Sequence, residues 1–288
     1  VILCKREEMD MMEEKAAFIR FEGLGGFDLD ATLDCGQCFQ FSPLPDGGWS
    51  GVAGGYGAEL RKKGETLVLS PADRDEESAA FWRRYLDLDR DYDALRREFC
   101  TDKQLRRCVE YAPGIHVLRQ PAWETLLCFI LSQNNNVPRI KGIVGRLCSF
   151  FGTPVAGGWT FPSAQRLAGQ TESDLSVLRA GWRSAYLLDA VEKVASGALP
   201  LDEVAELPIE EAREALQTIK GVGPKVAECI LLYGMGRLEA FPMDVWMKRA
   251  MAVLFPGRQP EDFGPYAGIA QQFIFHFCRM HPGLVRAG

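Results

Sequence analysis

The sequence has no apolar run long enough to cross a membrane and no excess of positive charge. A transmembrane helix needs about 20 consecutive apolar residues, and the apolar start at residues 1–4 is also too short for a signal sequence. The formal net charge of the 288 residues is −6. Because affinity for DNA phosphates comes largely from lysine and arginine, this balance argues against indiscriminate binding to nucleic acid, although it permits a local basic face.

Motifs for metals and nucleotides are equally scarce. Of the nine cysteines, only Cys35 and Cys38 have CxxC spacing, and no second pair or nearby histidine completes a zinc site. The three histidines show no ligand spacing: His116, His276 and His281. Neither GxGxxG nor the GxxxxGK[ST] loop of NTP-binding proteins occurs. An odd number of scattered cysteines is typical of reduced thiols, so we expect an intracellular protein.

The patterns that are present predict an α+β fold. The hydrophobic share of 47% and the charged share of 25% fit an ordinary globular protein. We expect residues 1–17 to be a charged leader, either frayed or an exposed helix. For 18–112 we expect an antiparallel sheet with flanking helices, because glycine turns at 45–48 and at Gly64 separate short alternating runs. For 113–288 we expect a helical domain, since apolar stripes recur at helical spacing.

The stretch from 219 to 250 carries the densest chemistry. Gly221 and Gly223 form a short glycine turn, Pro224 suits a first helical position, and Lys225 follows at once. Asp244 stands after a proline and before an apolar stripe, as the N-cap of a second helix would. An amine and a carboxylate thus begin two successive helices. The positive helix end and partial burial both disfavour a protonated amine, which predicts a nucleophilic lysine.

The glycine turn also has a plain interpretation. Two glycines before a helix let backbone amides approach a phosphate closely, yet most glycine turns between helices are only turns. A lysine at a helix start is usually solvated. The combination with Asp244 in the same unit favours a functional site.

This stretch resembles the helix-hairpin-helix and Gly/Pro-Asp motif of base-excision DNA glycosylases. It is most similar to the 8-oxoguanine DNA glycosylase family, whose lysine and aspartate match Lys225 and Asp244. The resemblance covers roughly residues 18–279 and implies a bifunctional glycosylase and AP lyase that flips 8-oxoguanine out of its pair with cytosine. Lys225 would attack C1′, form a Schiff base and lead to β-elimination, while Asp244 would stabilise the positive charge on the sugar.

The same resemblance assigns a base pocket. Gly36 matches the residue whose carbonyl accepts a hydrogen from N7 of 8-oxoguanine, which guanine lacks there. Gln271 matches the glutamine at the Watson–Crick edge, Phe275 the phenylalanine that stacks on the base, and Cys229 the thiol on its other face. By residue type alone, Gly36 would be a turn, Gln271 a solvated side chain, and Cys229 and Phe275 core residues.

A second set of residues would hold the opened duplex. Asn134 matches the residue that fills the hole left by the extruded base, and Arg139 the reader of the partner cytosine. Trp182 and Arg183 resemble a tyrosine–arginine pair, with the tryptophan stacking in the duplex and Arg183 joining Arg139. By residue type alone, the three asparagines at 134–136 would form a polar turn. Trp182 and Arg183 would be exposed side chains that follow a capping glycine.

The hairpin would grip the phosphates. The amides of Gly221, Gly223 and Val226 match the family's phosphate and ion cradle. Trp246 stands where many relatives carry a phosphate-contacting histidine. Tryptophan donates one hydrogen bond but carries no charge, so we expect a weaker or rearranged phosphate contact there.

The resemblance implies no cofactor and no catalytic metal, with a structural monovalent or calcium ion at the hairpin. The four-cysteine cluster of iron–sulfur glycosylases is absent, so no such cluster is expected. The implied partner is double-stranded DNA containing 8-oxoguanine opposite cytosine, bound by a monomer and without a membrane, in the cytoplasm or nucleoid of a bacterium or the nucleus of a eukaryote.

Two alternatives remain open. A monofunctional helix-hairpin-helix glycosylase for alkylated bases would share the hairpin and Asp244 but would use water in place of Lys225. A non-catalytic helix-hairpin-helix DNA-binding module would keep the hairpin and need neither of these two residues.

Overall fold

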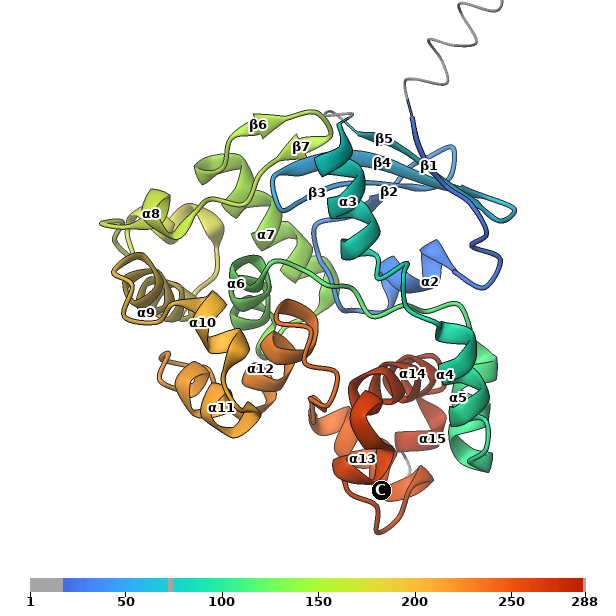
Figure 1. Ribbon diagram of the computed structural model, residues 1–288. Helices are drawn as coiled ribbons and strands as arrows, with labels where there is room; N and C mark the ends of the chain where they lie inside the picture. The colour runs from blue at the N-terminus through green and yellow to red at the C-terminus, as the bar shows by residue number, and fades with distance from the viewer. Residues whose placement is uncertain (1–17, 72–74, 287–288) are drawn as a thin grey trace, which may run out of the picture.

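The computed structural model describes residues 18–71 and 75–286, and the leader expected at 1–17 lies outside them. A five-stranded sheet comes first in the chain and helices follow, which confirms the predicted α+β fold (Figure 1). The sheet has the order β1-β5-β4-β3-β2 and every pairing is antiparallel. Its strands are β1 (Ile19–Phe21), β2 (Ser42–Pro43), β3 (Trp49–Ala53), β4 (Tyr56–Lys63) and β5 (Thr66–Pro71).

Alternating side chains explain why one face of the sheet is buried. Leu60 of β4 lies opposite Leu69 of β5, and both are fully buried. The turn between these strands contains Gly64 at φ +58°, a conformation that glycine adopts without strain. Helix α3 (Glu76–Tyr85) lies against the sheet in Figure 1 and buries Trp82 and Tyr85 in the smaller hydrophobic core.

A short helix inside the sheet region was not predicted. Helix α2 (Leu29–Asp34) interrupts the strands and is capped by Asp28, whose carboxylate accepts from the amide of Ala31 at 2.9 Å. The glycines that precede it favour a turn, so the sequence does not indicate a helix cap at this position. The helix matters because it leads directly into the loop of Cys35, Gly36 and Gln37.

Helices make up most of the remaining chain. A two-stranded ribbon, β6 (Pro154–Val155) and β7 (Gly158–Trp159), is the other sheet of the described residues. The α-helices are α4 (Tyr92–Phe99), α5 (Lys103–Tyr111), α6 (Ala122–Ser132), α7 (Val137–Phe151), α8 (Ala164–Leu167), α9 (Arg183–Ala195), α10 (Leu201–Glu206), α11 (Ile209–Gln217), α12 (Pro224–Cys229), α13 (Val245–Leu254), α14 (Ala267–Met280) and α15 (Gly283–Arg286). The tighter or wider helices are η1 (Asp174–Leu178), η2 (Ile230–Gly234) and η3 (Pro260–Tyr266).

Two of these irregular segments lie next to expected site residues. The 3₁₀ segment η1 precedes Gly181 and Trp182, and it stops before Arg179 because that residue takes the left-handed conformation at φ +56°. Segment η2 continues α12 as a π-helix, in which the amide of Met235 donates to the carbonyl of Ile230 at 3.0 Å. Such π segments occur frequently at functional sites.

The larger hydrophobic core lies among the helices. It contains Leu126, Ile130, Ile143 and Leu147 from the apolar stripes of α6 and α7, and all four are fully buried. Helices α4 and α5, which belong to the predicted 18–112 unit, also pack into this core, with Phe99 against Phe273 of α14. The boundary after residue 112 stays a prediction.

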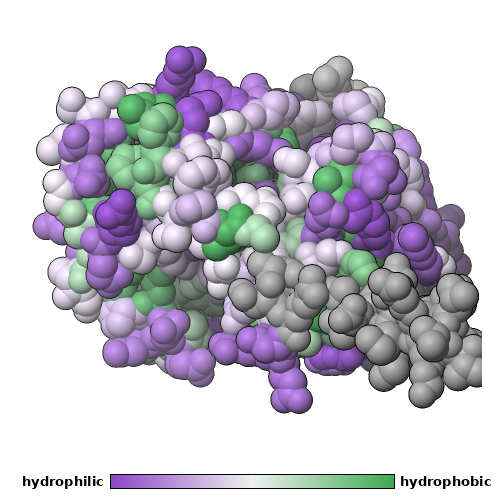
Figure 2. Space-filling model, turned by 90° about the horizontal axis from the view of Figure 1, so that it is seen from above, coloured by the Kyte–Doolittle hydropathy of each residue, from purple (hydrophilic) through white to green (hydrophobic). Residues whose placement is uncertain are grey.

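The surface contains no extended apolar face in the view from above. Figure 2 shows hydrophobic residues in separate small groups among hydrophilic ones, outside the grey atoms. Within the described ranges, no helix is both long enough and apolar enough to span a bilayer.

Candidate active site

One small cavity unites all six residues expected to carry catalysis and base recognition. Its volume is about 50 Å³. The 35–37 loop, α6, the α12–η2 unit, the start of α13 and α14 all contribute to it. Its lining consists of Gly36, Phe129, Lys225, Cys229, Tyr233, Pro242, Asp244, Gln271 and Phe275.

The cavity is narrow in this conformation. Pockets that enclose organic ligands usually measure about 300–1,000 Å³, so a purine enters only when lining side chains move. Phe275 is half-buried and lies at the cavity beside Gly36, where a Cβ on that glycine would be 3.6 Å from the phenylalanine ring. This ring therefore forms the wall of the cavity beside Gly36.

Lys225 begins α12 in the way the sequence predicts. Gly223 is the N-cap in an extended conformation and Pro224 occupies the first helical position. The Nζ atom of Lys225 lies 5.1 Å from the centroid of the Phe129 ring. One turn on, burial raises the pKa of the Cys229 thiol to about 11, although the charge and the hydrogen bond of Lys225 oppose this rise. The thiol is therefore neutral at physiological pH.

Asp244 is the N-cap of α13, as expected. Its Oδ1 accepts a hydrogen bond from the amide of Met247 at 2.7 Å. The cap fixes the orientation of the carboxylate at the start of the helix. Because Asp244 and Lys225 line the same cavity, an amine and an oriented carboxylate face one common space.

A buried glutamine holds the loop that contains Gly36. The side-chain amide of Gln37 donates to the carbonyls of Thr32 at 2.9 Å and His116 at 2.8 Å, and its oxygen accepts from the amide of Leu118 at 2.9 Å. Gly36 itself has φ +91°, a conformation that disfavours a side chain. The loop is thus fixed around the residue expected to read N7.

Gln271 lies in the cavity with one polar atom to spare. Only 2% of the residue is exposed, and its Nε2 donates to the carbonyl of Pro242 at 3.2 Å. Its Oε1 is buried and has no hydrogen-bond partner among the described residues. Because leaving a buried acceptor unpaired is costly, this oxygen is suited to accept a hydrogen from a bound base.

Arg183 is not free in this conformation. It is 2% exposed, and its guanidinium donates to the carbonyls of Gln133, Asn134 and Ala180. Burial lowers its pKa, and the nearby charge of Arg139 adds to this effect. Asn134 is held at φ +47° and is exposed, as is Arg139. Arg183 thus holds the Asn134 loop, and its role at a cytosine stays a prediction.

Helix α9 links the expected duplex contacts to the hairpin. Trp182, half of whose surface is exposed, meets the ring of Tyr186 edge-on at 5.2 Å. Tyr186 packs so closely on Gly221 that a Cβ there would lie 2.1 Å from its ring, and Gly221 has φ +82°. Asp189 accepts from the amide of Lys220 at 2.7 Å. The hairpin is therefore braced by the helix that carries Trp182.

The remaining hairpin residues have mixed surroundings. The amide of Val226 already donates to the carbonyl of Gly223 at 3.0 Å, so in this conformation it serves the helix start. No atom outside its immediate neighbours lies within 4 Å of a Cβ placed on Gly223. Trp246 is half-buried against the larger core, and the adjacent Lys248 and Arg249 are exposed.

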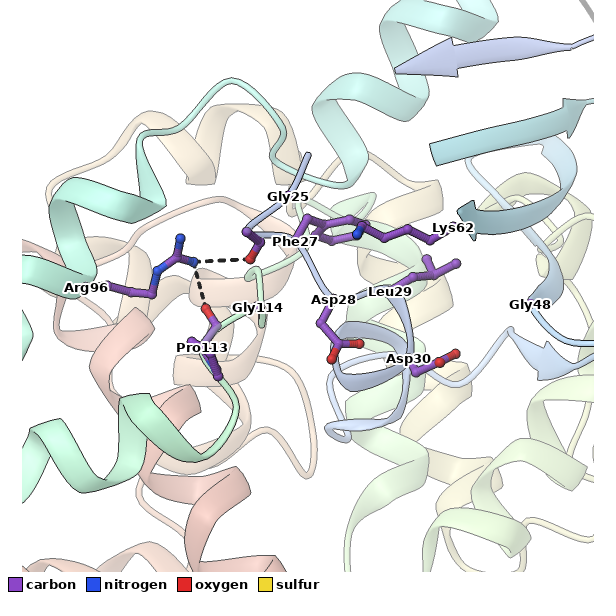
Figure 3. A pocket seen from close by; sticks show the side chains of 11 residues that line it. Gly25, Phe27, Asp28, Leu29, Asp30, Gly48, Lys62, Arg96, Pro113 and Gly114 are labelled. Atoms are coloured by element: carbon purple, nitrogen blue, oxygen red, sulfur yellow. Dashed lines mark hydrogen bonds between the residues drawn. The ribbon is translucent and has the colours of Figure 1, made fainter. Parts of the chain in front are cut away.

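Larger cavities occur in the described chain, and one of about 730 Å³ includes Lys225 but no other expected catalytic or base-binding residue. Another cavity, of about 490 Å³, is lined by none of the expected site residues. Figure 3 shows its lining, in which Arg96 donates to the carbonyls of Gly26 and Pro113. Among the described residues no three His, Cys, Asp or Glu side chains are grouped so as to hold a metal ion. Cys35 and Cys38 are buried free thiols.

Three lining residues were not predicted as site residues: Phe129, Tyr233 and Pro242. Phe129 and Tyr233 stack at 5.4 Å with an interplanar angle of 12°. Phe129 lies in an apolar helix with few polar positions, and Tyr233 follows the spacing of a buried stripe. Nothing in those patterns separates a cavity wall from ordinary core.

Comparisons with known proteins agree with this geometry. Residues 22–126 match the family model "8-oxoguanine DNA glycosylase, N-terminal domain". The chain is 30% identical to "N-glycosylase/DNA lyase OGG1" of Arabidopsis thaliana over 86% of this chain and 76% of that one. It is 28% identical to a "Probable N-glycosylase/DNA lyase" of Methanothermobacter thermautotrophicus over 89% and 95% of the two chains.

Solved structures give the same result. The 8-oxoguanine glycosylase/lyase of Clostridium acetobutylicum, in complex with double-stranded DNA containing cytosine opposite 8-oxoG, has a TM-score of 0.83 at 34% identity over 90% of this chain and 93% of that one. MBOgg1 in complex with a low-affinity DNA ligand has a TM-score of 0.87 at 35% identity over 92% and 96%. A 3-methyladenine DNA glycosylase of Archaeoglobus fulgidus, at 20% identity and a TM-score of 0.74, shares the fold.

The hairpin between α11 and α12, followed by a lysine and a capping aspartate on one cavity, defines a DNA glycosylase of the helix-hairpin-helix class. Within that class, the chain belongs to the 8-oxoguanine DNA glycosylase family.

Proposed function

We propose that this chain removes 8-oxoguanine paired with cytosine from duplex DNA and then cleaves the strand at the abasic site. The observation that carries this proposal is the single cavity shared by Lys225, Asp244 and the four base-binding candidates. The N-glycosylase/DNA lyase relatives and the Clostridium enzyme with its 8-oxoG-containing DNA support the same activity.

Recognition of the lesion depends on the hydrogen at N7, which 8-oxoguanine has and guanine lacks. The carbonyl of Gly36 accepts this hydrogen, and the free Oε1 of Gln271 accepts from the Watson–Crick edge. Phe275 and the neutral Cys229 enclose the two faces of the base. Guanine would present a lone pair to the Gly36 carbonyl, and this repulsion disfavours the undamaged base.

Catalysis begins when the deprotonated amine of Lys225 attacks C1′ of the lesion. A bond forms between Nζ and C1′ while the C1′–N9 bond breaks, and the base leaves with the bonding electrons and takes up a proton. The carboxylate of Asp244 stabilises the positive charge that develops on the sugar. Ring opening gives a Schiff base between Lys225 and C1′, and loss of a proton from C2′ expels the 3′ phosphate by β-elimination.

The duplex is held on the side of the Asn134 loop and the hairpin. Asn134 fills the gap left by the flipped base, Trp182 stacks in the opened duplex, and Arg139 reads the cytosine with Arg183 behind it. The amides of Gly221 and Gly223, with that of Val226 once it is released from Gly223, face a phosphate.

The phosphate contact near Asp244 takes a different form in this chain. Trp246 packs against the core and has no charge to offer. Lys248 and Arg249, exposed in the first turns of α13, supply the positive charge there. An ion at the hairpin would be held by backbone carbonyls, and no step of the reaction depends on it.

The test is a single-turnover assay in which free base and cut strand are measured separately. Duplexes carrying 8-oxoguanine opposite cytosine should yield both products, and Asp244→Asn should slow base release by at least about 100-fold. Release of 3-methyladenine with no 8-oxoguanine released would favour the alkylated-base alternative. Binding without release of any base would favour the non-catalytic module.

A further inference from the structure

Two side chains of α14 that the proposed chemistry does not use reach the loop of Gly36. Gln272, of which 1% is exposed, donates through Nε2 to the carbonyl of Cys35 at 3.3 Å. Arg279 donates through Nη1 to the carbonyl of Asp34 at 2.8 Å. A Cβ on Gly36 would lie 3.3 Å from the same Nη1 atom. Both side chains thus bind the backbone immediately before the lesion-reading glycine.

The backbone after Gly36 is fixed in the same manner. The side-chain amide of Gln120 donates to the carbonyl of Gln37 at 2.7 Å. The carbonyls of residues 34, 35 and 37 therefore each accept a side-chain hydrogen bond. Between the described residues, no hydrogen bond involves the carbonyl of Gly36. The carbonyl assigned to the lesion is the one that the loop leaves unoccupied.

Gln272 also connects the loop to the wall beside the nucleophile. Its Oε1 accepts from the hydroxyl of Tyr233 at 2.6 Å. Tyr233 stacks on Phe129, and the ring of Phe129 lies next to the amine of Lys225. Because both polar ends of the buried Gln272 are bonded, the side chain has one defined orientation.

We propose that Gln272 and Arg279 are positioning residues that aim the carbonyl of Gly36 at N7 of the flipped base and so set the preference for 8-oxoguanine over guanine. This inference rests on the proposed function. The physical reason is directional: a hydrogen bond weakens steeply when its angle falls below about 120°. Gly36 has the widest backbone freedom of any residue type, so its carbonyl keeps one direction only if its neighbours are held.

The experiment compares Arg279→Leu with Arg258→Leu. Both arginines are partly exposed, at 33% and 31% of their side chains, and both have a backbone carbonyl and a carboxylate as partners. Arg258 bonds Asp262 and Asp102, and neither partner belongs to the Gly36 loop. Single-turnover excision of 8-oxoguanine opposite cytosine should fall about tenfold in Arg279→Leu. It should stay within about twofold of wild type in Arg258→Leu. Arg279→Lys, which keeps a donor, should recover part of the loss.

Two further readouts separate positioning from a structural or DNA-binding role. Borohydride trapping on a duplex with a preformed abasic site needs no base recognition, so Arg279→Leu should trap as wild type does. Binding is compared in the inactive Lys225→Gln protein with and without Arg279→Leu. The Kd for a guanine duplex divided by the Kd for an 8-oxoguanine duplex should be about tenfold smaller when Arg279→Leu is present. Gln272→Leu, if it folds, should give the same two results as Arg279→Leu. Tyr233→Phe removes only the hydroxyl that bonds Gln272 and should change both readouts in the same direction by a smaller amount.

Equal losses on the lesion and the abasic duplex would overturn the proposal, because they would show that Arg279 contributes to folding or phosphate binding. An unchanged excision rate and an unchanged Kd ratio in Arg279→Leu would overturn it as well. Failure of the wild-type protein to excise 8-oxoguanine would instead refute the proposed function, so the two failures are distinguishable.

Discussion

The amine of Lys225 and the ring of Phe129 face each other across the cavity, with Nζ 5.1 Å from the ring centroid. These residues are 96 positions apart in the chain and come from α12 and α6. The ring covers one side of the amine and limits where it can lie. Phe129 therefore holds the nucleophile in place as well as forming a wall of the base pocket.

Replacement of Phe129 by leucine tests this contact. Loss of the ring removes the surface that positions the amine, so the rate of covalent trapping should fall by about tenfold. The measurement is borohydride trapping on an abasic duplex. Phe99→Leu, another buried ring with an edge contact to Phe273 at 6.3 Å, is the matched control for lost packing. Equal losses in both variants would show that Phe129 acts only as core.

Gly36→Ala should impair lesion excision with little effect on the fold. At φ +91° an alanine is strained by about 1–2 kcal/mol, and its Cβ would lie 3.3 Å from Arg279 and 3.6 Å from Phe275. We expect 8-oxoguanine excision to fall at least about tenfold in a single-turnover assay. Gly23→Ala is the control, since φ is +73° and nothing lies within 4 Å. A rate near that of wild type in Gly36→Ala would contradict the assigned role.

The two hairpin glycines should respond differently to alanine. In Gly221→Ala the new Cβ would meet the ring of Tyr186 at 2.1 Å and φ is +82°, so the hairpin must shift. Gly223→Ala meets nothing within 4 Å and has φ −93°, so the fold should be retained. Thermal unfolding measures the difference, and Gly221→Ala should lose about 2 kcal/mol or more. Equal melting temperatures would refute the tight packing of Tyr186 on the hairpin.

Glu124 should make stability depend on pH. Its buried carboxyl accepts hydrogen bonds from the amide of Gly54 at 2.9 Å and from the side chain of Gln40. Burial raises its pKa from 4.5 to about 7. The folded state therefore keeps a proton that the unfolded state loses. This stabilisation is complete below pH 4.5 and is lost as pH rises to about 7, by on the order of 3 kcal/mol.

Urea unfolding of wild type and Glu124→Gln from pH 4.5 to 8 measures this effect. Wild type should lose stability relative to Glu124→Gln as the pH rises, because an amide cannot ionise. Parallel pH profiles of the two proteins would rule out the raised pKa.

Local signals account for the parts of the site that were predicted. The glycines before Pro224 and the Asp244 cap satisfy helix ends within a few residues, so sequence spacing alone defines them. The stripes of α6 and α7 likewise follow from periodicity. Short-range patterns therefore predict where Lys225, Cys229 and Asp244 lie in their helices. Their roles are implied by the family resemblance.

Long-range contacts explain what was not predicted. Tyr233 lines the cavity from the π-helical segment η2, and no residue pattern marks that segment. Arg183 bonds the 133–134 carbonyls across 50 positions, which no spacing rule reveals. The bonds from Gln272 and Arg279 to the Gly36 loop span 237 and 245 positions. Such contacts depend on tertiary packing, and sequence periodicity carries no information about them.

Borohydride trapping on duplexes carrying 8-oxoguanine opposite cytosine or adenine tests the central claim most directly. The account predicts a covalent complex that forms faster with the cytosine pair and disappears in Lys225→Gln, while that variant still binds the duplex. Base release without any trapped complex, or trapping that persists in Lys225→Gln, would contradict the assignment of Lys225 as the nucleophile.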